Sequence, residues 1–399
     1  MNIIDLPYIR VGNCYYKFVK IPLISGDFLD SIIRWNYEFI KHDHLKEDYS
    51  KIPKYDGFCV VPEHLKFKQE IGKFYNRYMP FIHKPISGEW KFTEYFLKHI
   101  FQDHYELGLD YIKLLIEKPI QKLPVICLVS KERSTGKTTF LLYLKALFGS
   151  NMTINSNEDF KSSFNSEWIA KLLIGVDETF LDRKEDSERL KNLSTAKLYK
   201  AEAKGQDRIE VEFFGKFILC SNNEDGFLII EPGETRYWVI KINPFEKEIE
   251  NIIDKLTAEI PHFLDFILKR PFFSKNESRM WFNPKLLETI ALKKVIRRSR
   301  NKLELEILSI MLTILEEKEL NELCFCVNDV QDWLNRKGFK AIEALQIKRI
   351  FQNEWKMEPS TNSYSYTRYR FANEGYIIEE PAKGRYYKMD KINIINFND

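Results

Sequence analysis

The sequence predicts an α/β core between about residues 120 and 250, with a mixed, mostly helical region before it and a winged-helix-like region after it. Three observations predict this fold class. Continuous apolar runs typical of buried parallel strands recur along the core, helical patterns separate them, and 399 residues are too many for one ordinary core. We expect domains at residues 1–118, 119–245, 246–302 (a helical lid and basic linker) and 303–399.

Composition excludes several classes of protein. With 44% hydrophobic and 30% charged residues, the chain is globular and not disordered. The net charge of +3 neither requires nor excludes a polyanionic partner. The longest apolar candidate, Leu305–Leu315, is too short to span a membrane, and the N-terminus lacks a signal-peptide pattern. Because no apolar run is long enough, we expect no membrane partner. Six cysteines without a CxxC pair favour a reduced, cytoplasmic protein.

Residues 1 to about 90 carry no evident chemistry, and we expect residues 1–118 to form an oligomerisation region or collar. His42 and His44 lack a third metal ligand nearby, so a solvated loop is expected there. The patterns predict strands at Tyr15–Ile24 and Phe58–Val61, and helices at Phe28–Ile40, Trp90–His99 and Leu107–Glu117.

A phosphate-binding loop is predicted after the apolar strand Val125–Ser130. The loop KERSTGKT leads into a helical run that ends at Gly149, and strand, loop and helix in this order are the context that the motif requires. Backbone N–H groups at the helix start would bind phosphate, Lys137 would reach the β- and γ-phosphates, and Thr138 would hold Mg²⁺. The expected nucleotide contacts are Ser134, Thr135, Gly136, Lys137, Thr138 and Thr139.

The loop departs from the motif in one respect. Lys131 stands five residues before Gly136, where the motif has its first glycine. This departure leaves the loop conformation and the nucleotide affinity open, and a chance GKT sequence is the alternative.

Two carboxylates end a second apolar strand, Lys171–Glu178, 40 residues after Lys137. Asp177 would hold Mg²⁺, through water, and Glu178 would orient and deprotonate the attacking water. The alternative is an acidic pair that only caps a strand end.

Two further polar residues belong to later strand-like runs. Asn222 ends the run KFILCSNN and could hydrogen-bond the γ-phosphate and the lytic water, with Asn223 as the next candidate; a turn-forming Asn pair is the alternative. Arg236, in Glu234–Ile242, could act as an arginine finger on the nucleotide of a neighbouring subunit or form a surface salt bridge.

Together these motifs resemble those of superfamily 3 helicases, and more narrowly the helicase part of phage, plasmid and poxvirus-type primase-helicases. The stretches 123–151 and 171–224 carry the resemblance, which covers roughly residues 90–270. It implies an AAA+-like P-loop NTPase core, ATP and Mg²⁺ as cofactors, and a homo-oligomeric ring, a hexamer in this family, that translocates on single-stranded or forked DNA. The primase half is absent, so the resemblance also implies a separate primase as a partner.

Residue by residue, the resemblance assigns roles to positions already singled out. Lys137 and Thr138 match the phosphate lysine and the Mg²⁺ hydroxyl, and Asp177 and Glu178 match the acidic pair. Asn222 matches the sensor asparagine, and Arg236 matches the finger position less securely. The segment Lys200–Lys216 matches a DNA-contacting hairpin, for which a solvated hairpin is the alternative. Its expected phosphate contacts are Lys200, Lys204, Arg208 and Lys216.

The C-terminal region has the element order of a winged helix. Ala341–Trp355 would be the recognition-type helix, and cations interleaved with tyrosines between Tyr366 and Lys388 would form the wing. The alternative is an ordinary helix and hairpin for subunit packing. The basic run within 293–302 is expected to be a solvated linker.

The sequence thus favours an ATP-dependent DNA helicase in the replication of a phage, plasmid or other mobile element, located in the host cytoplasm if viral. Two alternatives stay open. One is an AAA+-type DNA-binding ATPase, a loader or defence protein, that does not unwind DNA. The other is a non-enzymatic origin-binding replication protein.

Overall fold

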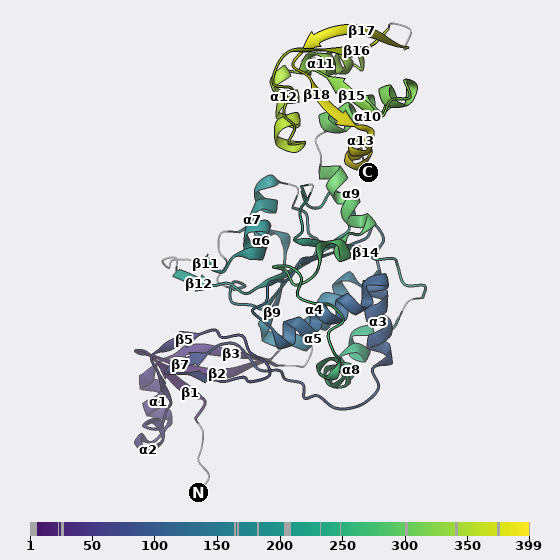
Figure 1. Ribbon diagram of the computed structural model, residues 1–399. Coiled ribbons are helices and arrows are strands. Elements are labelled where there is room, and N and C mark those ends of the chain that lie inside the picture. The colour runs from purple at the N-terminus through teal and green to yellow at the C-terminus, as the bar shows by residue number, and fades with distance from the viewer. Residues whose placement is uncertain are drawn as a thin grey trace. The chain divides into compact units, whose positions relative to one another are not determined.

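The structure is a computed structural model that describes residues 6–22, 24, 28–162, 165, 167–181, 183–202, 209–231, 233–247, 249–299, 302–339, 342–372 and 376–398. The chain forms two compact units (Figure 1). The first contains residues 1–224 and 235–289, and the second contains 225–234 and 290–399. The longer segment of the second unit therefore begins at Ile290, 13 residues before the predicted start of the C-terminal domain at residue 303.

A five-stranded parallel sheet forms the centre of the first unit, with strand order β14-β8-β13-β10-β9. Every residue of the three inner strands is buried, which explains why these strands are continuous apolar runs in the sequence. The predicted α/β core is confirmed at the level of a mixed α/β unit with a parallel sheet. The strands are β8 (Val125–Val129), β9 (Met152–Asn155), β10 (Leu173–Val176), β13 (Lys216–Ser221) and β14 (Tyr237–Lys241).

Four long helices pack with this sheet into one apolar cluster (Figure 1). The longest of them, α8, buries Leu256, Ile260, Phe263, Leu264 and Ile267, a spacing that gathers apolar side chains on one helical face. The four are α3 (Lys91–Phe101), α4 (Tyr105–Glu117), α5 (Lys137–Phe148) and α8 (Ile252–Lys269). Shorter elements complete the unit: α6 (Asn157–Lys161), α7 (Lys184–Thr195), the hairpin strands β11 (Leu198–Ala201) and β12 (Ile209–Glu212), and 3-10 turns at Gln102–His104, Gly149–Asn151 and Pro284–Leu287.

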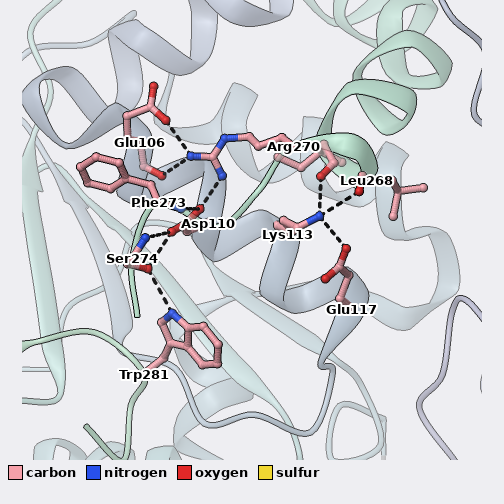
Figure 2. A network of polar contacts seen from close by, with 10 residues as sticks. Glu106, Asp110, Lys113, Glu117, Leu268, Arg270, Phe273, Ser274 and Trp281 are labelled. Carbon is pink, nitrogen blue, oxygen red and sulfur yellow. Dashed lines mark hydrogen bonds and ion pairs between the residues drawn. The ribbon is translucent and has the colours of Figure 1, made fainter. Parts of the chain in front are cut away.

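A buried polar network fastens α4 to the end of α8 and the segment after it (Figure 2). The Asp110 carboxylate is fully buried and accepts hydrogen bonds from the Arg270 guanidinium, the backbone N–H groups of Phe273 (3.1 Å) and Ser274 (2.6 Å), and the Ser274 hydroxyl. Lys113 Nζ donates to the carbonyls of Ile267 (2.8 Å) and Leu268 (3.0 Å), so it caps the last turn of α8. The buried charges are therefore paired, as burial requires.

Residues 8–76 contain more strand than helix, and the longer helices α3 and α4 follow them, so the N-terminal region is mixed. The predicted helix Phe28–Ile40 is wrong over its first part, because β3 (Phe28–Trp35) pairs with β2 (Cys14–Pro22) along its whole length. Asn36 then caps α1 (Tyr37–Asp43) by accepting the N–H of Glu38 at 2.9 Å. The remaining elements are β1 (Tyr8–Val11), α2 (Lys46–Tyr49), β4 (Lys54–Tyr55), β5 (Gly57–Cys59), β6 (Glu70–Ile71) and β7 (Phe74–Asn76).

The second unit has its own apolar core, centred on α10 (Lys302–Glu317) and α11 (Val327–Arg336). The predicted recognition-type helix is α12 (Ala344–Arg349) followed by a π-helical turn at Ile350–Glu354. The expected strand pair is present as the antiparallel hairpin β16 (Tyr364–Phe371) and β17 (Ile377–Gly384). The other elements are α9 (Ile290–Ser299), β15 (Glu322–Phe325), β18 (Tyr387–Asp390), which pairs with β15, and α13 (Lys391–Asn398).

Among the described helices, none combines the length and the apolar character that crossing a bilayer demands.

Candidate nucleotide site

The predicted phosphate loop runs from the end of β8 to the start of α5. Gly136 is the N-cap of α5 and has φ of +89°, a left-handed conformation that glycine adopts without strain. A Cβ at this position would lie 3.1 Å from the Phe245 ring and 3.3 Å from the Phe96 ring. Ser134 is also left-handed, with φ of +54°, although it is not a glycine. The loop is thus held in a strained shape, which in proteins is often found at functional sites.

A pocket of about 340 Å³ opens at the carboxyl ends of β8, β10 and β13. This volume lies within the range of about 300–1,000 Å³ that ligand pockets generally have. All predicted loop residues line it, together with residues that follow the other two strands. The lining residues are Arg133, Ser134, Thr135, Gly136, Lys137, Thr138, Thr139, Asp177, Glu178, Cys220, Ser221 and Asn222.

Lys137 is buried in this pocket and is held by the loop itself. Its Nζ donates to Thr135 Oγ1 at 3.1 Å and, at 3.4 Å, to the Glu132 carbonyl. Burial lowers the pKa of the Lys137 ammonium, against the opposing effect of nearby anionic groups such as Asp177. A bound phosphate would place further negative charge beside this ammonium and so oppose the effect of burial on its pKa.

Thr138 and Asp177 form the pair of oxygen donors expected for Mg²⁺. Thr138 Oγ1 donates to Asp177 Oδ2 at 3.0 Å, and the Asp177 N–H donates to the Asn155 carbonyl at 3.2 Å. Hydroxyl and carboxylate oxygens are the ligands that Mg²⁺ prefers, and it commonly uses only one or two carboxylates beside substrate phosphates. These donors therefore fit the ion. Within the described residues there is no cluster of three or more His, Cys, Asp or Glu that could hold a metal alone.

Glu178 follows Asp177 in an unusual backbone conformation. Its φ is +51°, and its N–H donates to Asp177 Oδ1 at 3.0 Å. The side chain is exposed at the pocket, where a water molecule could reach it. The strained turn thus separates the roles of two adjacent carboxylates, because Asp177 is bonded to Thr138 while Glu178 stays accessible.

Asn222 reaches the same pocket because β13 lies between β8 and β10 in the sheet. The end of β13 is fixed on both sides. Ser221 Oγ donates to the Thr179 carbonyl at 2.7 Å, and the Ser130 N–H donates to the Ser221 carbonyl at 3.2 Å. Asn222 is therefore placed between the phosphate loop and the acidic pair.

Two tethers of the loop were missed by the sequence analysis. Glu224 Oε1 accepts the N–H of Lys131, the residue that replaces the first glycine, at 3.3 Å, and it also pairs with Lys241 Nζ at 2.9 Å. His99 Nε2 lies 3.1 Å from the Thr135 carbonyl, and its ring stacks on Phe245 with centroids 3.9 Å apart. Only the position of Glu224 directly after the two asparagines could have suggested its role.

Arg236 lies at the amino ends of the parallel strands, whereas the pocket lies at their carboxyl ends. It precedes β14, which runs parallel to β8 with Tyr237 beside Val125, and the Val125 N–H donates to the Arg236 carbonyl at 2.8 Å. Because β8 has five residues, about 15 Å of strand separates these amino ends from the loop. Arg236 therefore does not line the pocket of its own chain.

The four residues of the hairpin that were predicted to contact DNA differ in their exposure and in whether the structure describes them. Lys200 is exposed on β11, while Lys204 and Arg208 lie outside the described residues. Lys216 is buried, with 2% of its surface exposed, and its Nζ donates to the Pro119 carbonyl and, at 2.7 Å, to the Phe214 carbonyl. This burial contradicts the expected contact between Lys216 and DNA, because the ammonium is used to hold the start of β13.

Three cations of the predicted wing lie close to carboxylates of the second unit. Arg368 Nε lies 2.7 Å from Asp329 Oδ1, and Lys388 Nζ lies 2.7 Å from Glu322 Oε2. Arg370 lies 3.6 Å from both Asp332 and Glu380. Their charges are thus partly neutralised inside the protein.

Comparison with known proteins supports the fold. Residues 128–236 match a family described as a family of unknown function (DUF5906), a span that contains every residue lining the pocket. No curated protein matches the sequence. The apo structure of the NrS-1 C terminal region (305-718) is similar with a TM-score of 0.63 at 15% identity, over 93% of this chain and 94% of that chain.

An A form apo structure of the same NrS-1 region has a TM-score of 0.56 at 16% identity, over 85% of this chain and 80% of that chain. A structure of JCV Helicase with a bound small molecule reaches only 0.31 at 12% identity, over 56% and 66% of the two chains, which is too low to compare folds. The chain therefore shares the fold of the NrS-1 C terminal region through both of its units.

Proposed function

We propose that this chain is an ATP-dependent DNA helicase of superfamily 3 type, with an AAA+-like core, that acts as a homo-oligomeric ring on single-stranded or forked DNA. One observation carries the proposal. Lys137, Thr138, Asp177, Glu178 and Asn222 come from three separate segments and line a single pocket at the carboxyl ends of parallel strands. Phosphoryl transfer to water needs this set of groups: a phosphate cradle, metal ligands, a base and a residue that orients the water.

Each residue of the pocket has its own role in ATP hydrolysis. The first N–H groups of α5 bind phosphate oxygens, and Lys137 exchanges its bonds to Thr135 and Glu132 for the β- and γ-phosphates. Asn222 orients the attacking water, and the Glu178 carboxylate accepts its proton. Thr138 and Asp177 would hold Mg²⁺, which when bound with ATP neutralises charge on the phosphate oxygens.

The position of Arg236 supports an oligomer. An arginine at the amino ends of the strands is too far to stabilise the transition state in its own pocket, whereas a neighbouring subunit in a ring can present it. A separate primase would complete the replication machinery that the resemblance implies.

Two variants test the proposal. In Lys137→Ala, nucleotide binding and turnover should both be lost, while Glu178→Gln should bind ATP but hydrolyse it about 10²–10⁴-fold more slowly, the range for removing a general base. Wild-type protein should unwind a forked duplex only with ATP. Turnover without unwinding would instead indicate a loader or defence ATPase, and nucleotide binding without turnover would indicate a non-enzymatic origin-binding protein.

A further inference from the structure

A cationic surface lies on α9 in the second unit. Ala291, Leu292 and Val295 are buried, and the opposite side of the helix carries four exposed cations. The spacing i, i+1, i+4, i+5 places them in two rows of two, about 6 Å apart along the helix axis within each row. We call this surface the α9 basic face: Lys293, Lys294, Arg297 and Arg298.

Among the residues that the structure describes, no carboxylate pairs with the cations of the α9 basic face, in contrast to Arg368 and Lys388 of the wing. Like charges four residues apart on a helix repel each other and destabilise the helix. The helix thus retains a repulsive arrangement that a bound polyanion would relieve.

The α9 helix is also firmly positioned. Segment 225–234 packs in the same unit and buries Phe227, Leu228 and Ile230. The Ile230 N–H donates to Ser299 Oγ at 2.9 Å, at the last residue of α9. This corrects the expectation of a solvated linker over residues 293–299, because they form a folded and anchored helix.

We infer that the α9 basic face binds the phosphodiester backbone of DNA without reading its bases. Regular rows of long cationic side chains match a regularly spaced polyanion, and Arg297 and Arg298 can each donate two hydrogen bonds to a phosphate. The α9 sequence contains no aromatic residue of the kind that anchors an interfacial helix in a membrane. The inference rests on the proposed function only for the choice of DNA as the polyanion.

The test uses the full chain without nucleotide or Mg²⁺, so that binding is measured apart from ATP turnover. Fluorescence anisotropy of a labelled single strand and of the corresponding duplex is recorded at several NaCl concentrations. The test variant replaces all four cations of the α9 basic face with Gln. The matched control removes four exposed lysines of the first unit, so that net charge changes equally: Lys46→Gln, Lys51→Gln, Lys66→Gln and Lys68→Gln.

The α9 variant should bind the preferred DNA form at least about tenfold more weakly than the control, and the slope of log K against log[salt] should decrease by about 3 to 4. In the milder Lys293→Gln/Lys294→Gln variant, the slope should decrease by about half as much. This variant keeps the test decisive if the fourfold variant is too unstable to measure. Wild-type binding by both α9 variants, or an equal loss in the control, would overturn the inference. Loss of binding to phosphatidylserine vesicles with DNA binding unchanged would overturn it too.

The result is separable from the proposed function. A protein that never unwinds DNA can still show the α9-dependent salt slope, and an active helicase can lack it.

Discussion

Glu224 and Lys241 form an ion pair at 2.9 Å, and the same Glu224 oxygen accepts the N–H of Lys131 at the start of the phosphate loop. Glu224 follows β13 and Lys241 ends β14, the two strands that flank β8. The pair therefore connects the exits of three strands at the position where the loop lacks its first glycine. The loop is thus tethered by a paired carboxylate at the position where the standard motif has its first glycine.

Glu224→Ala should weaken nucleotide binding more than it slows turnover, because the loop loses a tether while Glu178 and Asn222 stay in place. We expect the dissociation constant of a fluorescent ATP analogue to rise about threefold to tenfold, the effect of losing one charge-assisted hydrogen bond. Glu246→Ala, which removes an exposed carboxylate on the next loop, is the control. A change in turnover alone would contradict the tethering role.

Mixing two inactive variants tests whether Arg236 acts between subunits. Arg236→Ala and Glu178→Gln should each lose ATPase activity alone. In mixed oligomers, some interfaces combine an intact Glu178 with an intact Arg236 from the neighbour, so activity should return in proportion to those interfaces. ATPase rates across mixing ratios measure this effect, and a flat response would place Arg236 outside catalysis.

The buried network of Figure 2 predicts a large effect on stability. Asp110→Ala leaves the Arg270 guanidinium, whose side chain is 8% exposed, without its buried partner. Removing one member of a buried ion pair destabilises a protein by about 3–5 kcal/mol. The exposed pair of Lys269 and Asp265 is the control, since Lys269→Gln should cost less than about 1 kcal/mol. Urea unfolding of the two variants measures the difference.

Stability should depend on pH through His64. Burial lowers the pKa of this imidazole to about 4, while an unfolded histidine titrates near 6.5. Between these values the unfolded state binds the extra proton, so the free energy of unfolding falls as pH drops from about 6.5 to 4, by up to about 1.4 kcal/mol per pH unit.

His64→Phe should flatten this part of the stability profile, even if the lost hydrogen bond between His64 Nε2 and Tyr78 Oη lowers stability at every pH. His42→Gln, at an exposed position, should leave the slope unchanged. Chemical unfolding at several pH values gives both profiles, and parallel slopes for wild type and His64→Phe would refute the role of His64.

The parallel strands of the core were predictable because strands buried on both faces are continuous apolar runs followed by polar loops. The β3 strand was not, because its apolar residues Phe28, Leu29, Ile32, Ile33 and Trp35 also have helical spacing. Pairing with β2 decides the outcome, and that partner lies outside any local window.

In the candidate site, too, some residues were predictable from local sequence and others were not. Residues that adjoin strand ends, such as Asp177 and Asn222, follow from local sequence. The tether from His99 to Thr135 joins segments 36 residues apart, and no local pattern marks it. Nor can a sequence show that the long side chain of Lys216 turns inward to the Pro119 carbonyl.

The second unit contains a ten-residue excursion from the first, Asp225–Glu234, whose ends lie close to Asn222 and Arg236 in the chain. A protein shortened at Thr289 would keep this excursion but lose the α9 helix against which it is anchored. Phe227, Leu228 and Ile230, which are buried and lie between β13 and β14 in the chain, would then be exposed, and exposed apolar side chains promote aggregation. Inactivity of such a truncated protein would report misfolding near Asn222, so point substitutions are the sound way to dissect the two units.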